Sequence, residues 1–197
     1  MLKVAITGNI GSGKSLVEKL LKKRGYTVSD ADKIAHDILK NDFETIEKIN
    51  TFFGHKDIYD DDGSISRKKL GKLVFSSPGM RYKLEFIMHP VIKAKMKEFL
   101  DQERDLKVLF LSVPLLFEAN MQDLFDKTLF VAADENLRLK RILSRDNLEY
   151  GEAKDRIAAQ MPQEQKMDKC DFVIYNNTNV ASLEFQLDLI LKKIIVS

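Results

Sequence analysis

Short apolar runs alternate with longer stretches in which apolar residues recur every three or four positions. The short runs are typical of buried strands, and the longer spacing is typical of helices that cover a sheet. The predicted strands are Leu2–Thr7, Tyr26–Ser29, Val108–Val113, Lys127–Ala132 and Asp171–Tyr175. Because strands and helices alternate, the pattern predicts an α/β fold with a parallel sheet flanked by helices.

The widest interval between predicted strands, approximately residues 33–106, contains only helical patterns. The helices expected there carry Ile34 and Ile38, span Asp42–Phe53, begin at the caps Ser66 and Ser77, and begin after His89–Pro90. A serine at the start of each of two patterns is a favourable helix cap. We therefore expect a helical insertion beside the sheet.

A second helical excursion interrupts the strands at approximately residues 134–168. It is predicted to contain helices over Asp134–Ser144 and Glu149–Met161, and a closing helix with Leu183 and Leu187 on its apolar face follows the last strand. At this length, residues 1–197 are expected to form one domain that carries both helical excursions.

The stretch Gly8–Ser15 fits G-x-x-x-x-G-K-S, the pattern of a P-loop, between the first predicted strand and a helix. Glycines let backbone N–H groups crowd around an anion, and the helix N-terminus adds a favourable dipole. Lys14 would reach the β- and γ-phosphates, and the Ser15 hydroxyl would ligate Mg²⁺ between them. The pattern predicts binding of ATP or GTP. The residues expected to bind the nucleotide are Gly11, Ser12, Gly13, Lys14, Ser15 and Leu16.

Inserted helices near a P-loop hold the acceptor and close a lid in small-molecule kinases. We therefore expect residues 33–106 to bind the acceptor and residues 134–168 to form the lid. Within the lid, Arg138, Arg141 and Arg145 are spaced to share one helix face. That face either meets the ATP phosphates or is an ordinary solvated surface. Of the three we favour Arg141, which sits in the middle of the helix.

Two aspartates follow the second predicted strand. Ligands of open α/β sheets bind at the carboxyl ends of the strands, so Asp30 and Asp32 are expected to face the γ-phosphate. A carboxylate there accepts the proton of an attacking hydroxyl, or caps the helix that starts near Ala31. We favour Asp32 as the base and Asp30 as the cap.

Other polar residues give weaker signals. The three histidines, His36, His55 and His89, are not spaced as metal ligands. His89 precedes Pro90 at a predicted helix start and is a candidate contact to an anionic acceptor. Glu118 follows the central predicted strand, where it either binds an acceptor hydroxyl or caps the next segment.

Charge and cysteine content narrow the class of protein. A net charge of +2 over 197 residues points neither to nucleic acid nor to an anionic membrane. No apolar stretch is long enough to cross a bilayer. The lone Cys170 excludes an internal disulfide, and its use suits a reducing cytoplasm. We expect a cytoplasmic protein whose partners are small molecules.

Taken together, the segments resemble the dephospho-coenzyme A kinase family nearly end to end. The resemblance rests on Thr7–Ser15, Asp30–Asp32 with Ile34–His36, Asp62–Gly63 ahead of Arg67–Leu70, His89–Pro90, Pro114–Glu118, Leu139–Arg141 with Arg145–Asp146, Gln160–Pro162, and Asp171–Ile174 with Asn176–Asn177. The loop alone is generic, whereas these segments in this order are much more specific.

The resemblance implies ATP-dependent phosphorylation of the ribose 3′-hydroxyl of dephospho-coenzyme A. It implies that Asp32 is the base, Lys14 the phosphate lysine and Arg141 the lid arginine. Mg²⁺ would accompany ATP. The expected contacts to the acceptor are Asp32, His89, Leu115 and Glu118. We expect a monomer or a weak homo-oligomer.

Two positions depart from the family pattern. Asn9 stands where glycine is common, and Leu16 stands where threonine is common. Leu16 removes a hydroxyl that could touch the α-phosphate.

Three rival functions share the loop. A nucleoside or nucleotide kinase would have a compact acceptor site. A regulatory GTPase would need an Asn-Lys-x-Asp segment, which is not found. An ATPase acting on nucleic acid would be expected to show a basic face.

Overall fold

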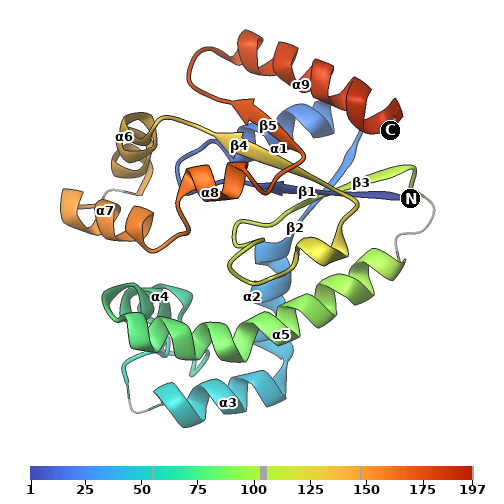
Figure 1. The fold of residues 1–197 in the computed structure, drawn as a ribbon. Coiled ribbons are helices and arrows are strands. Elements are labelled where there is room, and N and C mark those ends of the chain that lie inside the picture. The colour runs from blue at the N-terminus through green and yellow to red at the C-terminus, as the bar shows by residue number, and fades with distance from the viewer. Residues whose placement is uncertain (55, 103–105, 147, 197) are drawn as a thin grey trace. The chain divides into compact units, whose positions relative to one another are not determined.

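The computed structural model describes residues 1–54, 56–102, 106–146 and 148–196. The chain forms two compact units (Figure 1). One unit comprises Met1–Asp30 together with Glu103–Ser197, and the other comprises Ala31–Gln102. No helix within the described ranges combines the length and the apolar character needed to span a bilayer.

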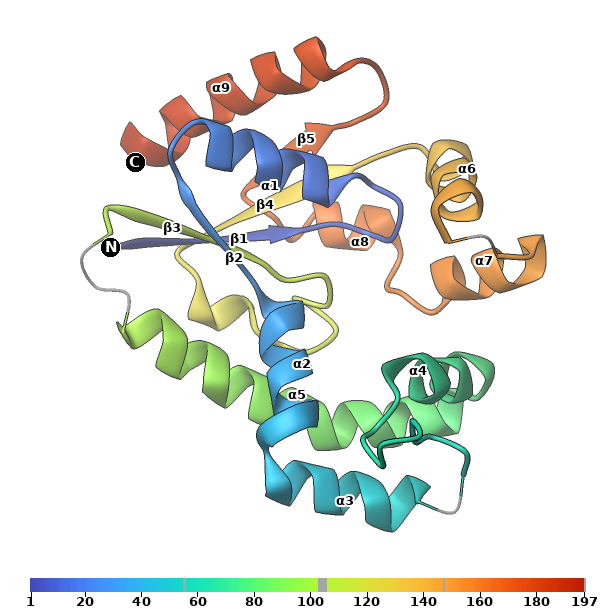
Figure 2. The same cartoon turned by 180° about the vertical axis from the view of Figure 1, so that it is seen from behind.

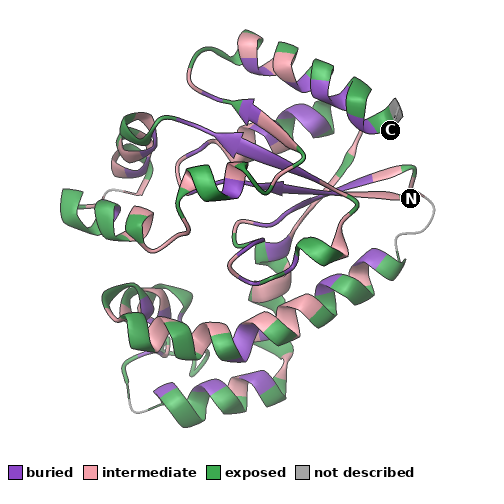
Figure 3. Ribbon diagram, in the orientation of Figure 1, coloured by how far each residue is buried: buried purple, intermediate pink, exposed green. Residues whose placement is uncertain are grey.

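The first unit is built on a parallel sheet of five strands in the order β2-β3-β1-β4-β5. The strands are β1 (Leu2–Thr7), β2 (Thr27–Asp30), β3 (Val108–Ser112), β4 (Lys127–Ala132) and β5 (Phe172–Tyr175). All five predicted strands are confirmed, as is the parallel sheet. Burial is greatest in the inner strands β1, β3 and β4 (Figure 3), as expected for a sheet covered by helices.

The register places several strand ends at one level. Ser112 at the end of β3 pairs with Ile6 of β1 on one side and with Asp30 of β2 on the other. The loop that follows β1 therefore leaves the middle of the sheet, with the last residue of β3 beside it and that of β2 one strand further out on the same side. This is the edge at which open α/β sheets bind ligands.

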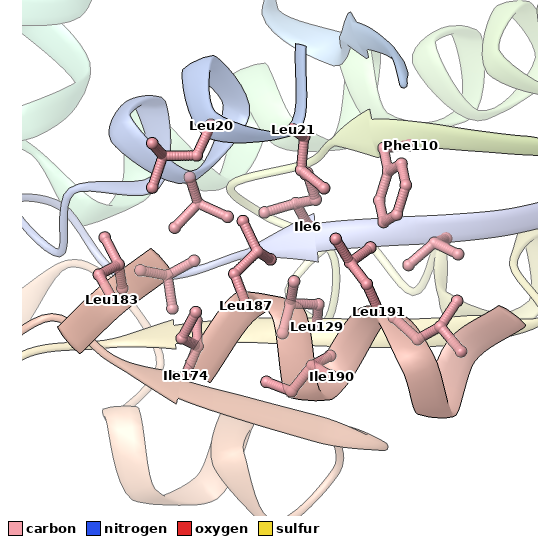
Figure 4. Packing of buried hydrophobic residues seen from close by; sticks show 14 residues of the cluster. Ile6, Leu20, Leu21, Phe110, Leu129, Ile174, Leu183, Leu187, Ile190 and Leu191 are labelled. Atoms are coloured by element: carbon pink, nitrogen blue, oxygen red, sulfur yellow. The ribbon is translucent and has the colours of Figure 1, made fainter. Parts of the chain in front are cut away.

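Helices α1 (Lys14–Lys23) and α9 (Val180–Val196) share one hydrophobic core with the sheet (Figure 4). The buried side chains come from every third or fourth position, which is why both helices were predicted by their spacing. Among them are Val17, Leu20 and Leu21 of α1 and Leu183, Leu187, Ile190 and Leu191 of α9. This packing fixes the start of α1 against the end of β1.

Between β4 and β5 the chain forms α6 (Glu135–Asp146), α7 (Tyr150–Ala158) and α8 (Gln163–Met167), and a 3₁₀ turn, η1 (Gln122–Leu124), precedes β4. The prediction that one helix continues to Met161 was wrong, because α7 ends at Ala158. Two causes are visible. Pro162 disfavours the helical conformation at Met161. In addition, Gln160 and Met161 form hydrogen bonds with the P-loop.

The second unit consists of α2 (Ala31–Asn41), α3 (Phe43–Phe53), α4 (Arg67–Ser76) and α5 (Pro78–Gln102). Figure 2 shows the first three beside the long α5. They enclose a separate core of Ile38, Ile49, Phe53, Ile58, Leu70, Val74, Ile87 and Met88. Asp42 caps α3 by accepting a hydrogen bond from the backbone N–H of Thr45 at 3.0 Å.

One predicted helix start in this unit was wrong, and one predicted start is confirmed without the expected capping bond. No new helix begins after His89–Pro90, because Pro90 lies inside the continuous helix α5. A proline removes one helical hydrogen bond, but Ile87 and Met88 just before it and Met96 beyond it are buried, so packing continues through the break. Ser66 occupies the cap position of α4, but its side chain makes no capping hydrogen bond.

Cys170 is half-buried between α8 and β5. Burial raises the pKa of its thiol to about 11, so the thiol stays protonated near neutral pH. A protonated thiol is a weak nucleophile. This agrees with a structural role for the side chain rather than a reactive one.

The core of the first unit gives a direct test of packing. Leu187 is 0% exposed, whereas Leu189 on the same helix is 45% exposed. We expect Leu187→Ala to lower the free energy of unfolding by about 2–5 kcal/mol, because it leaves a cavity beneath α9. Leu189→Ala should change it by no more than about 0.5 kcal/mol. Urea unfolding of both variants checks this, and equal losses would contradict the packing described.

Candidate active site

Gly11 and Gly13 give the P-loop its shape. Both adopt the left-handed backbone conformation, with φ of 79° and 89°, which glycine adopts at little cost. There is also no room for a side chain at either glycine. A Cβ atom on Gly11 would lie 2.6 Å from the carbonyl oxygen of Arg138, and one on Gly13 would overlap the side-chain amide of Asn176. The loop therefore requires glycine at both positions.

Two side chains hold the loop from outside. Arg141 of α6 donates from Nη1 to the carbonyl oxygens of Gly11 and Ser12, each at 3.2 Å. Its Nη2 donates to the carbonyl oxygen of Asn176 at 2.9 Å. Asn176, just after β5, donates from Nδ2 to the carbonyl of Ser12 at 2.8 Å. These bonds engage the electronegative carbonyl groups of the loop and fix its backbone.

The beginning of the loop is tied to the segment between α7 and α8. The backbone N–H of Ile10 donates to Gln160 Oε1 at 2.7 Å. The side-chain amide of Asn9 donates to the carbonyl oxygen of Met161 at 3.0 Å. Asn9 is buried, so the residue that departs from the family's common glycine anchors the loop instead of facing a ligand.

A cavity of about 460 Å³ lies beside the loop. It is lined by Gly11, Gly13, Ser15, Lys140, Arg141, Ser144 and Arg145. Its volume is in the range of small-molecule sites. The structure thus brings together Gly11, Gly13 and Ser15, which were predicted to bind ATP, with Arg141, which was predicted to meet the phosphates.

Lys14 lies in a cluster of polar side chains. Its ammonium group donates to Glu18 Oε1 at 3.0 Å and to the hydroxyl of Ser112. Ser112 in turn donates to the same Glu18 oxygen at 2.7 Å. Burial raises the pKa of Glu18, but the charge of Lys14 and the hydrogen bonds from Ser112 and Lys14 outweigh it, so the pKa is below its ordinary value. Glu18 is therefore ionised at neutral pH.

Glu118 also has two donors. Its Oε1 accepts from Lys166 Nζ at 2.6 Å and from the backbone N–H of Met161 at 3.1 Å. Lys166 is fully buried and also donates to the carbonyl oxygen of Pro114 at 3.3 Å. Glu118 thereby holds the segment that contacts the loop. Its Oε2 is buried without a hydrogen-bond partner in the described part of the chain, so contact of this atom with an acceptor stays a prediction.

The three arginines predicted to share a face of α6 have different surroundings. Arg138 is only 3% exposed, and this desolvation lowers its pKa. Arg145 is exposed and forms two hydrogen bonds with Asp146. Arg141 lies between these extremes and is the one that contacts the loop. A uniformly solvated face is therefore wrong for this helix.

The remaining predicted site residues are placed as follows. Asp32 is exposed in the first turn of α2, and His89 is half-buried in α5, so both belong to the Ala31–Gln102 unit. Leu115 is partly exposed. Leu16 packs against the core of the first unit, which gives its side chain a structural role. His55 lies outside the described residues.

Sequence reasoning assigned no role to Glu18, Ser112, Asn176 or Gln160. A local physical signal existed for Glu18 and Ser112, whereas Asn176 and Gln160 stood out only as parts of segments that resemble the family. Glu18 is four residues after Lys14 on one helix, a spacing at which opposite charges meet. Ser112 ends a predicted strand at the ligand-binding edge of the sheet. The contacts of Asn176 and Gln160 join residues more than 140 positions apart in the chain, and no local pattern reveals such pairs.

The central strand of the parallel sheet runs into a glycine-rich loop and then a helix, and a cavity of about 460 Å³ lies beside the loop. This arrangement defines the P-loop class of nucleotide-binding proteins. Comparison with known proteins agrees with this class. The dephospho-CoA kinase family profile matches residues 2–182. A dephospho-CoA kinase of Oceanobacillus iheyensis is 39% identical over 194 residues, which cover 98% of this chain and 97% of its relative.

Solved structures give the same result. The crystal structure of TT1252 from Thermus thermophilus aligns with a TM-score of 0.79 at 34% identity and covers 98% of this chain and 97% of that one. The dephospho-CoA kinase from Campylobacter jejuni aligns with a TM-score of 0.71 at 32% identity, with the same coverage. The chain belongs to the dephospho-CoA kinase family.

The geometry of the loop leads to a prediction about glycine. We expect Gly11→Ala to abolish tight ATP binding, because the new Cβ would press on the backbone of Arg138 and the left-handed φ would be strained. Gly25 is the matched control, since its φ is 84° but a Cβ atom added there would meet nothing within 4 Å. Gly25→Ala should cost about 1–2 kcal/mol of stability and leave ATP affinity unchanged.

Calorimetric titration with ATP and thermal unfolding of both variants separate the two effects. An ATP dissociation constant for Gly11→Ala within a few-fold of the parent would show that the close approach of the loop to α6 is not needed for binding.

Proposed function

We propose that the protein transfers the γ-phosphoryl group of ATP to the 3′-hydroxyl of the ribose of dephospho-coenzyme A, which gives coenzyme A and ADP. The observation that carries this proposal is the family match over residues 2–182, which includes both the P-loop and the Asp30–Asp32 segment. The loop alone supports binding of a nucleotide phosphate but does not specify the acceptor.

The nucleotide is proposed to bind in the cavity beside the loop. Its phosphates would accept hydrogen bonds from the loop backbone at the start of α1, where the helix dipole also favours negative charge. Lys14 would stabilise the charge that develops on the transferring group. Arg141 lines the same cavity, and its three hydrogen bonds to backbone carbonyls hold its guanidinium in place.

Mg²⁺ is proposed to accompany ATP. This ion prefers oxygen ligands and keeps several water molecules. The hydroxyl of Ser15 is an oxygen donor on the wall of the cavity, so the residues present fit the ion. When bound, the ion neutralises phosphate oxygens and orients the γ-phosphate.

Asp32 is proposed as the general base. It would accept the proton of the 3′-hydroxyl while that oxygen bonds to the γ-phosphorus, and the bond from phosphorus to the β–γ bridging oxygen breaks as ADP leaves. Its place supports this role. Asp32 follows β2 by two residues, and β2 ends at the level of Ser112 on the ligand-binding edge of the sheet.

The Ala31–Gln102 unit is proposed to bind the acceptor. It has a cavity of about 660 Å³ lined by His36, Lys40, Arg67 and Lys68, by the acidic Asp60 and Asp62, and by apolar residues such as Leu39 and Ile65. The basic and apolar parts of this lining suit a diphosphate attached to a long, largely uncharged arm. His89, Leu115 and Glu118 remain proposed contacts.

A cytoplasmic location and a monomeric or weakly associated form are part of the same proposal. A single cysteine supports a reducing compartment. The small net charge supports small molecules rather than nucleic acid as partners.

A phosphoryl-transfer assay with ATP and Mg²⁺ tests the assignment, with dephospho-coenzyme A, adenosine and AMP as competing acceptors. We expect dephospho-coenzyme A to have by far the highest kcat/KM and the product to carry a new 3′-phosphate by ³¹P NMR. Lys14→Ala is the control and should remove nearly all turnover. Faster transfer to AMP or adenosine would assign the chain to the nucleotide or nucleoside kinases.

The two aspartates are predicted to differ. Asp32→Asn keeps the shape of the side chain but loses the base, so kcat should fall by roughly 10²–10⁴. ATP affinity should stay near that of the parent. Asp30→Asn should be milder, because Asp30 directly precedes α2 and asparagine caps a helix as well as aspartate does. An inactive Asp30→Asn beside an active Asp32→Asn would reverse the assignment, and two active variants would exclude a general base at this pair.

A further inference from the structure

In the cluster of Lys14, Glu18 and Ser112, the proposed reaction gives a role to Lys14 but none to Glu18 or Ser112. Lys14 and Glu18 are one turn apart on α1, and Ser112 is the last residue of β3. Ser112 is fully buried, and the side chains of Lys14 and Glu18 are 17% and 16% exposed. One oxygen of Glu18 accepts hydrogen bonds from both partners. The carboxylate is thus fixed close to the lysine of the loop.

P-loop NTPases hold Mg²⁺ with the loop hydroxyl and an acidic side chain. In a parallel sheet such a group belongs at the carboxyl ends of the strands beside the loop. The strands that flank β1 end at Ser112 and Ala132, neither of which is acidic. Glu18 reaches the end of β3 from α1, with its Oε1 only 2.7 Å from the Ser112 hydroxyl. The helix therefore supplies the carboxylate that the end of β3 lacks.

The ion pair between Glu18 and Lys14 also affects the binding of ATP in the absence of a metal ion. Charges shielded from water interact strongly, so phosphates that approach Lys14 also meet the negative charge of Glu18. A cation between the carboxylate and the phosphates converts this repulsion into attraction. The cluster therefore favours ATP together with its metal over ATP alone.

We propose that Glu18, positioned by Ser112, holds the Mg²⁺ that accompanies the nucleotide, in place of an acidic residue at the end of β3. It would do so by accepting hydrogen bonds from water molecules bound to the ion, since Mg²⁺ retains several of them in proteins. This inference rests on the proposed function only in taking ATP with Mg²⁺ as the nucleotide.

The test measures ATP binding by calorimetry, without acceptor, in EDTA and over a series of Mg²⁺ concentrations. The readout is the ratio of the ATP dissociation constants without and with Mg²⁺. For Glu18→Gln we expect this ratio to fall by about 10- to 100-fold, the usual effect of losing a group that supports a metal's ligands. Metal-free ATP should bind at least as tightly as to the parent, which also shows that the variant is folded.

Two further variants control the result. Glu184→Gln removes a carboxylate that pairs with Arg24, just beyond the other end of α1, and should keep the parent's ratio. Adding Ser112→Asp to Glu18→Gln places a carboxylate at the end of β3. The double variant should recover most of the parent's ratio of ATP dissociation constants. The proposal is overturned if Glu18→Gln keeps the parent's ratio, as it would if Glu18 only restrained Lys14. It is also overturned if the added aspartate restores none of it.

These outcomes are separate from the identity of the acceptor, because no acceptor is present in the titration. A parent that binds Mg²⁺ and ATP but does not phosphorylate dephospho-coenzyme A would contradict the proposed function and leave the role of Glu18 intact.

Discussion

The hydrogen bonds from Arg141 and Asn176 to the carbonyl oxygens of Gly11 and Ser12 are the interaction on which the site depends. Arg141 lies on α6, between β4 and β5, and Asn176 directly follows β5. Together they hold a backbone conformation that glycine alone adopts easily. Because the loop leaves the central strand of a buried sheet, the core fixes its position. The hydrogen bonds from Arg141 and Asn176 then fix its shape.

The hydrogen bonds to the loop also restrict how the proposed lid, residues 134–168, could move. This segment touches the loop at both ends, through Arg141 on α6 and through Gln160 and Met161 after α7. Glu118 and the buried Lys166 support the second contact. Removing one partner of such a buried pair is costly because the other charge is left without compensation. A closing movement would therefore carry these contacts with it or be confined to the chain between them.

Local signals predicted much of this fold. The strands, the P-loop and the helix after it each follow from a pattern within about ten residues, and all are present in the structure. The failures have long-range causes. Pro90 was expected to begin a helix, but packing on both sides continues α5 through it. Met161 was expected to be helical, but its carbonyl binds Asn9 at a separation of 152 residues.

The residues of the candidate site also fall into those that local patterns predict and those that depend on long-range contacts. Gly11, Gly13, Ser15 and Arg141 could be predicted from motif and resemblance, and the structure gathers them around one cavity. Glu18 and Ser112 each carry a local signal, but the contact between them joins a helix and a strand that are 94 residues apart, and no local pattern predicts it. The catalytic role of Asp32 remains a prediction that rests on its place after β2.

The most direct test of the account is amide hydrogen exchange at Ile10 and Ser12 in the nucleotide-free protein, compared between the parent and Arg141→Lys. Both amides donate within the clamped loop, to Gln160 Oε1 and to the carbonyl of Asn9. Lysine keeps the charge but cannot make the same set of hydrogen bonds. We predict slow exchange at both amides in the parent and clearly faster exchange in the variant. Exchange in the parent at the rate of an unstructured chain would contradict a loop that is held in shape before the nucleotide binds.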